Sequence, residues 1–179
     1  AVHKALEQFF RQYQKTRTLP DKSLLHQSFS AALEQEILTP PQQDRLTRRG
    51  LDTLSAYYQQ YHQEFVAPLA VEKFFGYGFS KVILGSVPLG GKIDKIEPLG
   101  SDLKKVRVID YKTGRPKSRN DIEGKTAQGN GDYKRQLVFY QLLADLDQNF
   151  RFTVAETELD FVEADKNTGK LKKERFAIT

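Results

Sequence analysis

The sequence predicts a mixed α/β (α+β) domain in which a central mixed β-sheet is flanked by helices. Apolar residues recur at helical spacing through the first third of the 179-residue chain, whereas the middle of the chain alternates apolar and polar residues as strands do. A further helix then precedes two late strands. This order of helices, antiparallel meander, helix and strands differs from the regular βαβ alternation that predicts a fully parallel sheet.

The first 66 residues are expected to form a helical region. The first helix carries apolar residues at i, i+3, i+4 and i+7, and Thr39 is expected to cap the long third helix. Pro40 and Pro41 suit the first turn of that helix, because proline is pre-organised for this position. The three helices are expected over residues 3–13, 28–38 and 42–65.

The remainder, about residues 67–179, is expected to form the core that holds the sheet, within one domain over residues 1–179. Period-2 alternation between glycine-rich and polar turns predicts its strands. These are expected over residues 69–75, 79–84, 87–97, 104–112, 152–163 and 171–178, with turns at 98–102 and 165–169. A loop over residues 113–131 and a helix over residues 132–147 are expected to connect the fourth and fifth strands.

Composition excludes several classes of protein. Cysteine is absent, which rules out disulfides, thiolate zinc sites, cysteine-ligated iron–sulfur clusters and cysteine nucleophiles. The sequence has no Gly-x-Ser-x-Gly motif and no complete Walker A loop. No apolar run approaches the roughly 20 residues that span a bilayer, so we expect a cytoplasmic domain without a membrane partner. The absence of methionine indicates a fragment of a longer protein, or a sequence from which modified methionines are missing.

Two neighbouring strands each carry an aspartate inside an apolar alternation. Asp94 lies in one strand, and Asp110 lies in the next with Lys112 on the same face two residues later. A short turn would lay the strands side by side and bring two carboxylates and an ammonium together. Carboxylates held close repel unless a cation neutralises them, and Mg²⁺ prefers one or two carboxylates. From the residues alone, a surface salt bridge or a turn cap at the strand end remains an alternative to a metal site.

Basic residues gather around this pair. Residues 104–135 contain 10 Lys and Arg against 4 Asp and Glu, a net charge of +6, whereas the whole chain carries +5. The rest of the chain is therefore −1. A solvated loop would explain the excess, but the same excess is expected beside a phosphate-binding groove. Gln136 and Tyr140 lie at i, i+4 on one face of the following helix, and His3 opens the first helix.

Three motifs in this order resemble a known family. They are Gly91-x-Ile93-Asp94, the segment 108–114 with Asp110 and Lys112, and Gln136-x-x-x-Tyr140. They resemble the PD-(D/E)XK nuclease superfamily, in particular the RecB-like nuclease domains of UvrD/Rep-type helicases, whose first helix opens with a histidine as His3 does here. The resemblance runs from residue 3 to about residue 140 and implies a restriction-endonuclease-like core.

The resemblance implies a role for each matching residue. The implied ligands of a catalytic Mg²⁺ or Mn²⁺ are His3, Asp94, Asp110 and the backbone carbonyl of Tyr111. The implied catalytic residues are Asp94, Asp110 and Lys112. Gln136 and Tyr140 would contact the DNA backbone or order the active site, and Glu72 would be an accessory acid. The absence of cysteine excludes the subgroup that holds an iron–sulfur cluster.

We therefore expect a metal-dependent DNA nuclease domain that hydrolyses phosphodiester bonds. The resemblance implies a C-terminal module of an ATP-dependent helicase in DNA repair or recombination, an exonuclease on single-stranded DNA whose partners are the motor domains of the same chain. One alternative is a non-catalytic DNA-binding or partner-docking module on a nuclease-like scaffold. Another is a plain α+β domain with structural acids, which would place Asp94 and Asp110 far apart.

Overall fold

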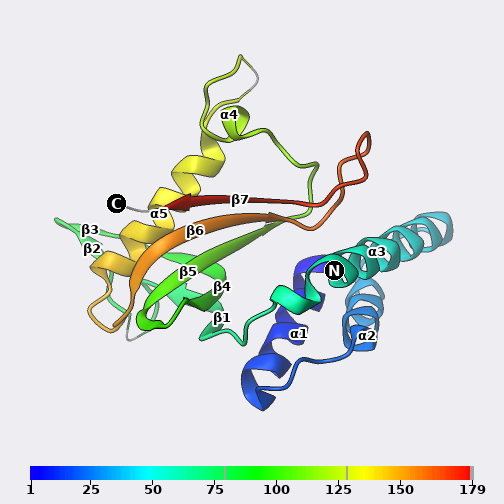
Figure 1. Cartoon of the computed structure of the whole chain (residues 1–179), viewed down its shortest axis with the longest axis horizontal. Coiled ribbons are helices and arrows are strands. Elements are labelled where there is room, and N and C mark those ends of the chain that lie inside the picture. The colour runs from blue at the N-terminus through cyan, green and yellow to red at the C-terminus, as the bar shows by residue number, and fades with distance from the viewer. Residues whose placement is uncertain (79, 128, 178–179) are drawn as a thin grey trace.

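The computed structural model describes residues 1–78, 80–127 and 129–177 (Figure 1). These residues form a five-stranded mixed sheet in the order β1-β4-β5-β6-β7. Strands β5 and β6 run parallel, and the other neighbours run antiparallel. The strands are β1 (Ala70–Phe75), β4 (Gly91–Leu99), β5 (Asp102–Lys112), β6 (Thr153–Phe161) and β7 (Lys172–Ala177). The predicted mixed sheet flanked by helices is confirmed.

The helices lie on both faces of this sheet. They are α1 (Val2–Thr16), α2 (Lys22–Leu33), α3 (Pro40–Tyr61), the 3₁₀ turn η1 (His62–Glu64), α4 (Arg119–Ile122) and α5 (Asp132–Leu146). Helices α1–α3 pack together at one end of the molecule, and α5 is the crossover that joins parallel strands β5 and β6 (Figure 1). No helix in the described part of the chain is long and apolar enough to cross a membrane.

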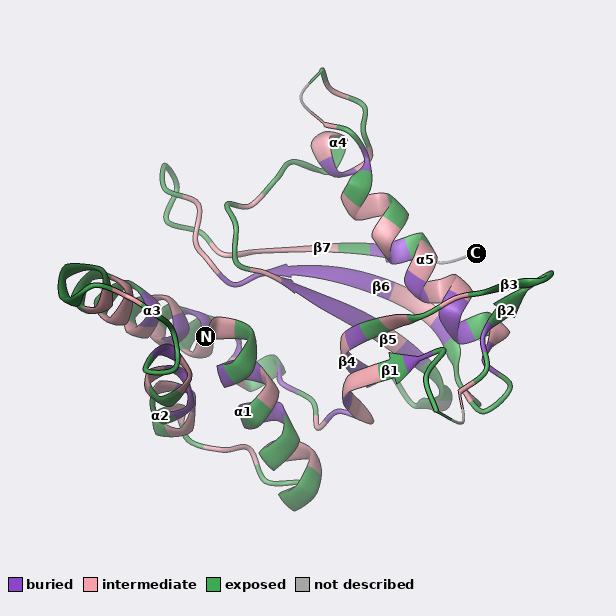
Figure 2. Ribbon diagram, turned by 180° about the vertical axis from the view of Figure 1, so that it is seen from behind, coloured by how far each residue is buried: buried purple, intermediate pink, exposed green. Residues whose placement is uncertain are grey.

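Strand β5 separates two hydrophobic cores because its side chains alternate between faces. Ile109 and Tyr111 pack with the helical region, in a core that includes Phe9 and Phe10 of α1. Val106 and Val108 point the other way and pack with α5. Buried residues therefore run along the middle of β5 and β6 (Figure 2). The central strands are held from both sides, which fixes the residues near their ends.

The helical region was predicted well except for the second helix. Helix α3 begins as expected, with a capping box in which the Thr39 backbone N–H donates to Gln42 Oε1 at 2.9 Å. The second helix spans Lys22–Leu33 rather than residues 28–38. Its N-cap is Asp21, whose carboxylate accepts from the Ser23 N–H at 2.9 Å. The second helix therefore begins at Lys22, six residues before the predicted start at residue 28.

The segment between β1 and β4 differs from the prediction. Two short strands, β2 (Ile83–Leu84) and β3 (Val87–Pro88), form a separate hairpin instead of extending the main sheet. The chain leaves β1 through Gly76, which has φ +73 and where a Cβ atom would lie 1.9 Å from the Leu89 carbonyl oxygen. The predicted strand start at Phe79 and strand end at Ile178 lie outside the described residues. The predicted loop at 113–131 contains the short helix α4.

Candidate active site

The site lies at a fork between β4 and β5. The two strands pair from Lys95 and Ile109 toward their connecting turn. In the described pairings, residues 91–93 of β4 are matched with β1, while residues 110–112 of β5 are matched with β6. The strands therefore diverge where β4 carries Asp94 and β5 carries Asp110, which leaves both carboxylates facing the opening.

Asp94 is tied to the backbone of β5. Its Oδ2 accepts a hydrogen bond from the Tyr111 N–H at 2.9 Å. Burial and the nearby Asp110 carboxylate raise the pKa of Asp94 to about 6, against the opposing effect of that hydrogen bond. The two carboxylates are thus close enough to repel each other, contrary to the reading in which the acids lie far apart.

Asp110 is buried and held by α5. Its Oδ1 accepts from the Tyr140 hydroxyl at 2.6 Å and from Gln136 Nε2 at 3.0 Å. Its Oδ2 lies 2.6 Å from Lys112 Nζ as an ion pair, yet has no hydrogen-bond partner of good geometry among the described residues. One lone-pair direction of a buried carboxylate thus stays available.

Gln136 and Tyr140 connect the catalytic candidates to each other. They lie one turn apart on α5, as predicted, and Gln136 Nε2 donates to Tyr140 Oη at 2.7 Å. Lys112 Nζ donates to Gln136 Oε1 at 2.7 Å, so Gln136 bridges the lysine and Asp110. Burial, and then Asp110, raise the pKa of Tyr140, which keeps its hydroxyl protonated as a donor. These contacts are those of residues that order a site.

His3 and Tyr111 join the helical region to the fork. His3 Nε2 lies 2.9 Å from the Tyr111 carbonyl oxygen and 3.7 Å from Asp94 Oδ2. Tyr111 therefore uses its N–H for Asp94 and its carbonyl for His3. Its ring points into the opposite core, where it stacks on Phe10 with centroids 6.2 Å apart. The predicted histidine thus reaches the fork from the first turn of α1.

Glu72 lies on β1 across from Asp94 and forms an ion pair with Lys92. The pairing of β1 with β4 passes from Lys73–Ile93 to Val71–Lys95 without a Glu72–Asp94 pair. Glu72 has φ +52, a left-handed conformation that is costly for a residue with a long side chain. Its carboxylate contributes to the raised pKa of Asp94. The strained residue therefore lies beside the predicted site.

The donor set at the fork suits a hard divalent cation. Carboxylate and carbonyl oxygens with one imidazole are ligands that Mg²⁺ and Mn²⁺ accept, and the orphaned Asp110 Oδ2 is a ready acceptor. Among the described residues, no three His, Asp or Glu side chains already stand in metal-binding geometry. In this arrangement His3 contacts the Tyr111 carbonyl and Lys112 is ion-paired with Asp110.

The basic excess around the site is only partly turned toward it. Arg107 lies three residues before Asp110 on β5 and pairs with Glu97 and Glu156 on the opposite face. Further cations are used in ion pairs around α4 and α5, namely Arg119, Lys125 and Lys134 with Glu123, and Arg135 with Asp132. The expectation that the whole excess surrounds Asp110 and Lys112 is therefore wrong.

Tyr133 is a site residue that the sequence reasoning missed. Its ring lies between two ammonium groups, 4.6 Å from Lys112 Nζ and 4.7 Å from Lys117 Nζ. The signal was present, since Tyr133 precedes Gln136 by three residues and so shares its helix face. Tyr133 and Lys117 extend the cationic side of the fork.

Comparison with known proteins identifies the family of the chain. A family model described as the PD-(D/E)XK nuclease superfamily matches residues 1–177. No curated protein matches the chain.

Proposed function

The chain belongs to the PD-(D/E)XK nuclease superfamily, and from this premise we propose that it is a metal-dependent deoxyribonuclease domain. One observation carries the proposal. Two carboxylates and an ammonium, from Asp94, Asp110 and Lys112, converge where β4 and β5 diverge. A structural role alone would not require like charges to be held together in this way.

The cation would be Mg²⁺ or Mn²⁺, held by His3, Asp94, Asp110 and the Tyr111 carbonyl. Such a cation supplies a nucleophilic water at neutral pH and neutralises charge on the phosphate. For the protein's part, Asp94 must be ionised, which its pKa of about 6 allows near neutral pH. His3 must release the Tyr111 carbonyl and present a neutral nitrogen.

Lys112 would act on the substrate rather than on the fold. Its ammonium is held by Gln136 as well as by Asp110, so it stays at the fork when Asp110 engages a cation. From there it would orient the attacking water or stabilise negative charge that develops on the phosphate oxygens. Gln136 and Tyr140 hold the side chains of Asp110 and Lys112 in fixed positions relative to each other. Glu72 would add negative charge beside Asp94 as an accessory acid.

The substrate and context follow from the resemblance to RecB-like domains. We propose hydrolysis of single-stranded DNA by an exonuclease module at the C-terminal end of a cytoplasmic helicase that acts in repair or recombination. The partners would be DNA and the motor domains of the same full-length chain. A cysteine-ligated iron–sulfur cluster has no place in this subgroup, because the sequence has no cysteine.

The test is DNA degradation with Mg²⁺ or Mn²⁺ by purified Asp110→Asn and Lys112→Ala proteins. Loss of a residue that acts in the transition state should lower the rate by about 10²-fold or more. Asp44→Asn and Lys15→Ala, at exposed positions of α3 and α1, are the matched controls and should keep the parent rate. Near-parental degradation by the Asp110 and Lys112 variants would refute the assignment.

The rival function is a binding module without catalysis. It predicts no Mn²⁺ site that depends on Asp94. Titration of Mn²⁺ by isothermal calorimetry into the parent and Asp94→Asn proteins separates the two functions. The proposed nuclease binds Mn²⁺ and loses this affinity with the substitution, because a buried carboxylate ligand is removed.

A further inference from the structure

Exposed aromatic rings and a lysine border the fork on the side of β1. Phe74 is 58% exposed and Tyr77 is 79% exposed, although both are large rings. Their ring centroids lie 6.4 Å apart. Lys92 Nζ lies 5.8 Å from the centroid of the Phe74 ring. We call Phe74, Tyr77 and Lys92 the aromatic strip.

The aromatic strip is adjacent to the carboxylates of the fork. Phe74 pairs with Lys92 across β1 and β4, and Lys92 precedes Asp94 by two residues. Two residues along a strand span about 7 Å and return to the same face. The ion pair between Lys92 and Glu72 ties the strip to the strained residue opposite Asp94. A polymer that reaches the carboxylates from this side would therefore cross the strip first.

The charge of this segment favours a polyanion. Residues 73–92 contain three lysines and neither aspartate nor glutamate, although Lys92 is ion-paired with Glu72, which directly precedes them. The middle of this segment forms the β2–β3 hairpin, which extends from the sheet away from α1–α3 (Figure 2). That hairpin adds exposed Ile83, Leu84 and Val87, which by themselves would suit a protein partner. Rings interleaved with cations are instead the composition with which proteins bind unpaired bases and their phosphates.

We propose that the aromatic strip stacks the bases of single-stranded DNA and guides the strand into the fork. The proposal rests on the proposed nuclease function and adds to it a binding site for unpaired bases outside the fork, because stacking on exposed rings requires unpaired bases. Phe74 and Tyr77 supply the faces for two successive bases. Lys92 supplies a cation for the phosphate between the strip and Asp94.

The test replaces the rings while keeping apolar side chains. A Phe74→Leu/Tyr77→Leu protein is titrated against fluorescein-labelled oligodeoxythymidylate of about 12 nucleotides, within the site sizes of single-strand binders. EDTA prevents cleavage, and anisotropy reports binding. We expect the dissociation constant to rise about ten-fold or more, because each stacked base contributes substantially to affinity. An abasic strand of the same length should bind the parent and the double variant alike.

The control is Ile37→Ala, which changes a fully exposed apolar residue far along the sequence and should bind as the parent does. A double variant that binds within about two-fold of the parent would overturn stacking and leave a protein partner as the occupant. Hydrolysis of bis(4-nitrophenyl) phosphate by the parent with Mn²⁺ tests the nuclease function separately. That substrate has no bases to stack, so failure of one assay is distinguishable from failure of the other.

Discussion

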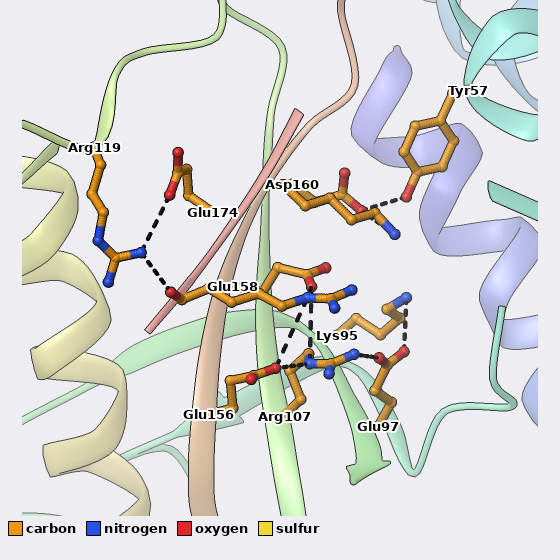
Figure 3. Close-up of polar contacts among 11 residues, drawn as sticks. Tyr57, Lys95, Glu97, Arg107, Arg119, Glu156, Glu158, Asp160 and Glu174 are labelled. Carbon is orange, nitrogen blue, oxygen red and sulfur yellow. Dashed lines mark hydrogen bonds and ion pairs between the residues drawn. The ribbon is translucent and has the colours of Figure 1, made fainter. Parts of the chain in front are cut away.

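Carboxylates gather in two places on the sheet, and the two places are neutralised differently. At the fork, Asp110 is ion-paired with Lys112, whereas Asp94 lies 3.7 Å from the His3 imidazole and is repelled by Asp110. On the opposite face of β4, β5 and β6, every acid has a cation from the chain (Figure 3). We call this second group the charge cluster; its members are Lys95, Glu97, Arg107, Glu156, Glu158, Asp160, Lys173 and Arg175.

The charge cluster is held by ion pairs within the chain, although Asp160 Oδ1 has no hydrogen-bond partner among the described residues. Arg107 Nη1 donates to Glu97 Oε1 at 3.0 Å and its Nε donates to Glu156. Arg175 Nε donates to Glu158 Oε2 at 2.5 Å. Asp160 is buried completely and accepts from the Tyr57 hydroxyl of α3 at 2.5 Å. The contrast indicates that several cations of the chain balance the acids of the charge cluster, whereas the two repelling acids of the fork would be stabilised by a further cation.

The largest expected effect comes from removing a cation of the charge cluster. Arg107→Met leaves Glu97, Glu156 and Glu158 without their shared partner, and breaking a buried ion pair costs about 3–5 kcal/mol. Urea unfolding followed by circular dichroism measures the loss. Arg48→Met, at an exposed position of α3, should change the free energy of unfolding little. If Arg107→Met and Arg48→Met have the same free energy of unfolding, the charge cluster contributes no more to stability than an exposed residue does, which would contradict this prediction.

Asp110→Asn removes both the repulsion of Asp94 and the ion pair with Lys112, so these two electrostatic effects on the stability of the metal-free protein oppose each other. The parent should gain about 2.7 kcal/mol at a Mg²⁺ concentration 100 times the dissociation constant, and the variant should not. Thermal melting with and without Mg²⁺ measures this difference. A parent without a Mg²⁺-dependent shift would contradict the idea that the fork awaits a cation.

Asp160 links the charge cluster to pH. Burial raises its pKa to about 6, despite the cation of Lys173, from an ordinary value of 3.8. Because the folded state holds this proton more tightly, the contribution of Asp160 to folding stability falls as pH rises from about 4 through about 6 and stays lower above it. Asp160→Asn should remove this contribution, which is on the order of 3 kcal/mol over the whole range. Urea titrations at pH 5 and pH 8 compare the two proteins, and identical pH dependence would contradict the assignment.

The smallest effect concerns the pH dependence of cation binding. Since burial and Asp110 raise the pKa of Asp94 to about 6, its carboxylate is mostly protonated at pH 5. Affinity for Mn²⁺ should rise about ten-fold from pH 5 to pH 7, which is about 1.4 kcal/mol. Calorimetric titration at both pH values measures it. A constant affinity would show that Asp94 is not a ligand.

Local patterns were sufficient to predict the elements that define the fork. The short turn between β4 and β5 sets Asp94 beside Asp110, and period 2 sets Lys112 with Asp110. The same two-residue alternation of a strand places Arg107 on the opposite face from Asp110. A count of charges along a stretch of sequence does not contain this information. The orientation of a charge, rather than its presence, was the missing information.

Other features depend on contacts distant in sequence. The β2–β3 hairpin is separate from the main sheet, and Gly76 lies so close to the Leu89 carbonyl that a Cβ atom would clash, an approach that composition does not specify. The charge cluster is formed by residues that are distant in sequence. Lys95 and Arg175, for example, lie 80 positions apart. The approach of Tyr57 to Asp160 likewise depends on how α3 packs against β6.

Tyr111 makes the helical region and the fork one cooperative unit of folding. Its ring belongs to the core of α1–α3, and its backbone holds both Asp94 and His3. Local opening of a protein proceeds in such units, so α1 should not detach while the fork stays ordered. Exchange of the single Tyr111 amide hydrogen should therefore slow when either the helical core or the fork is stabilised, which makes that amide a reporter for both.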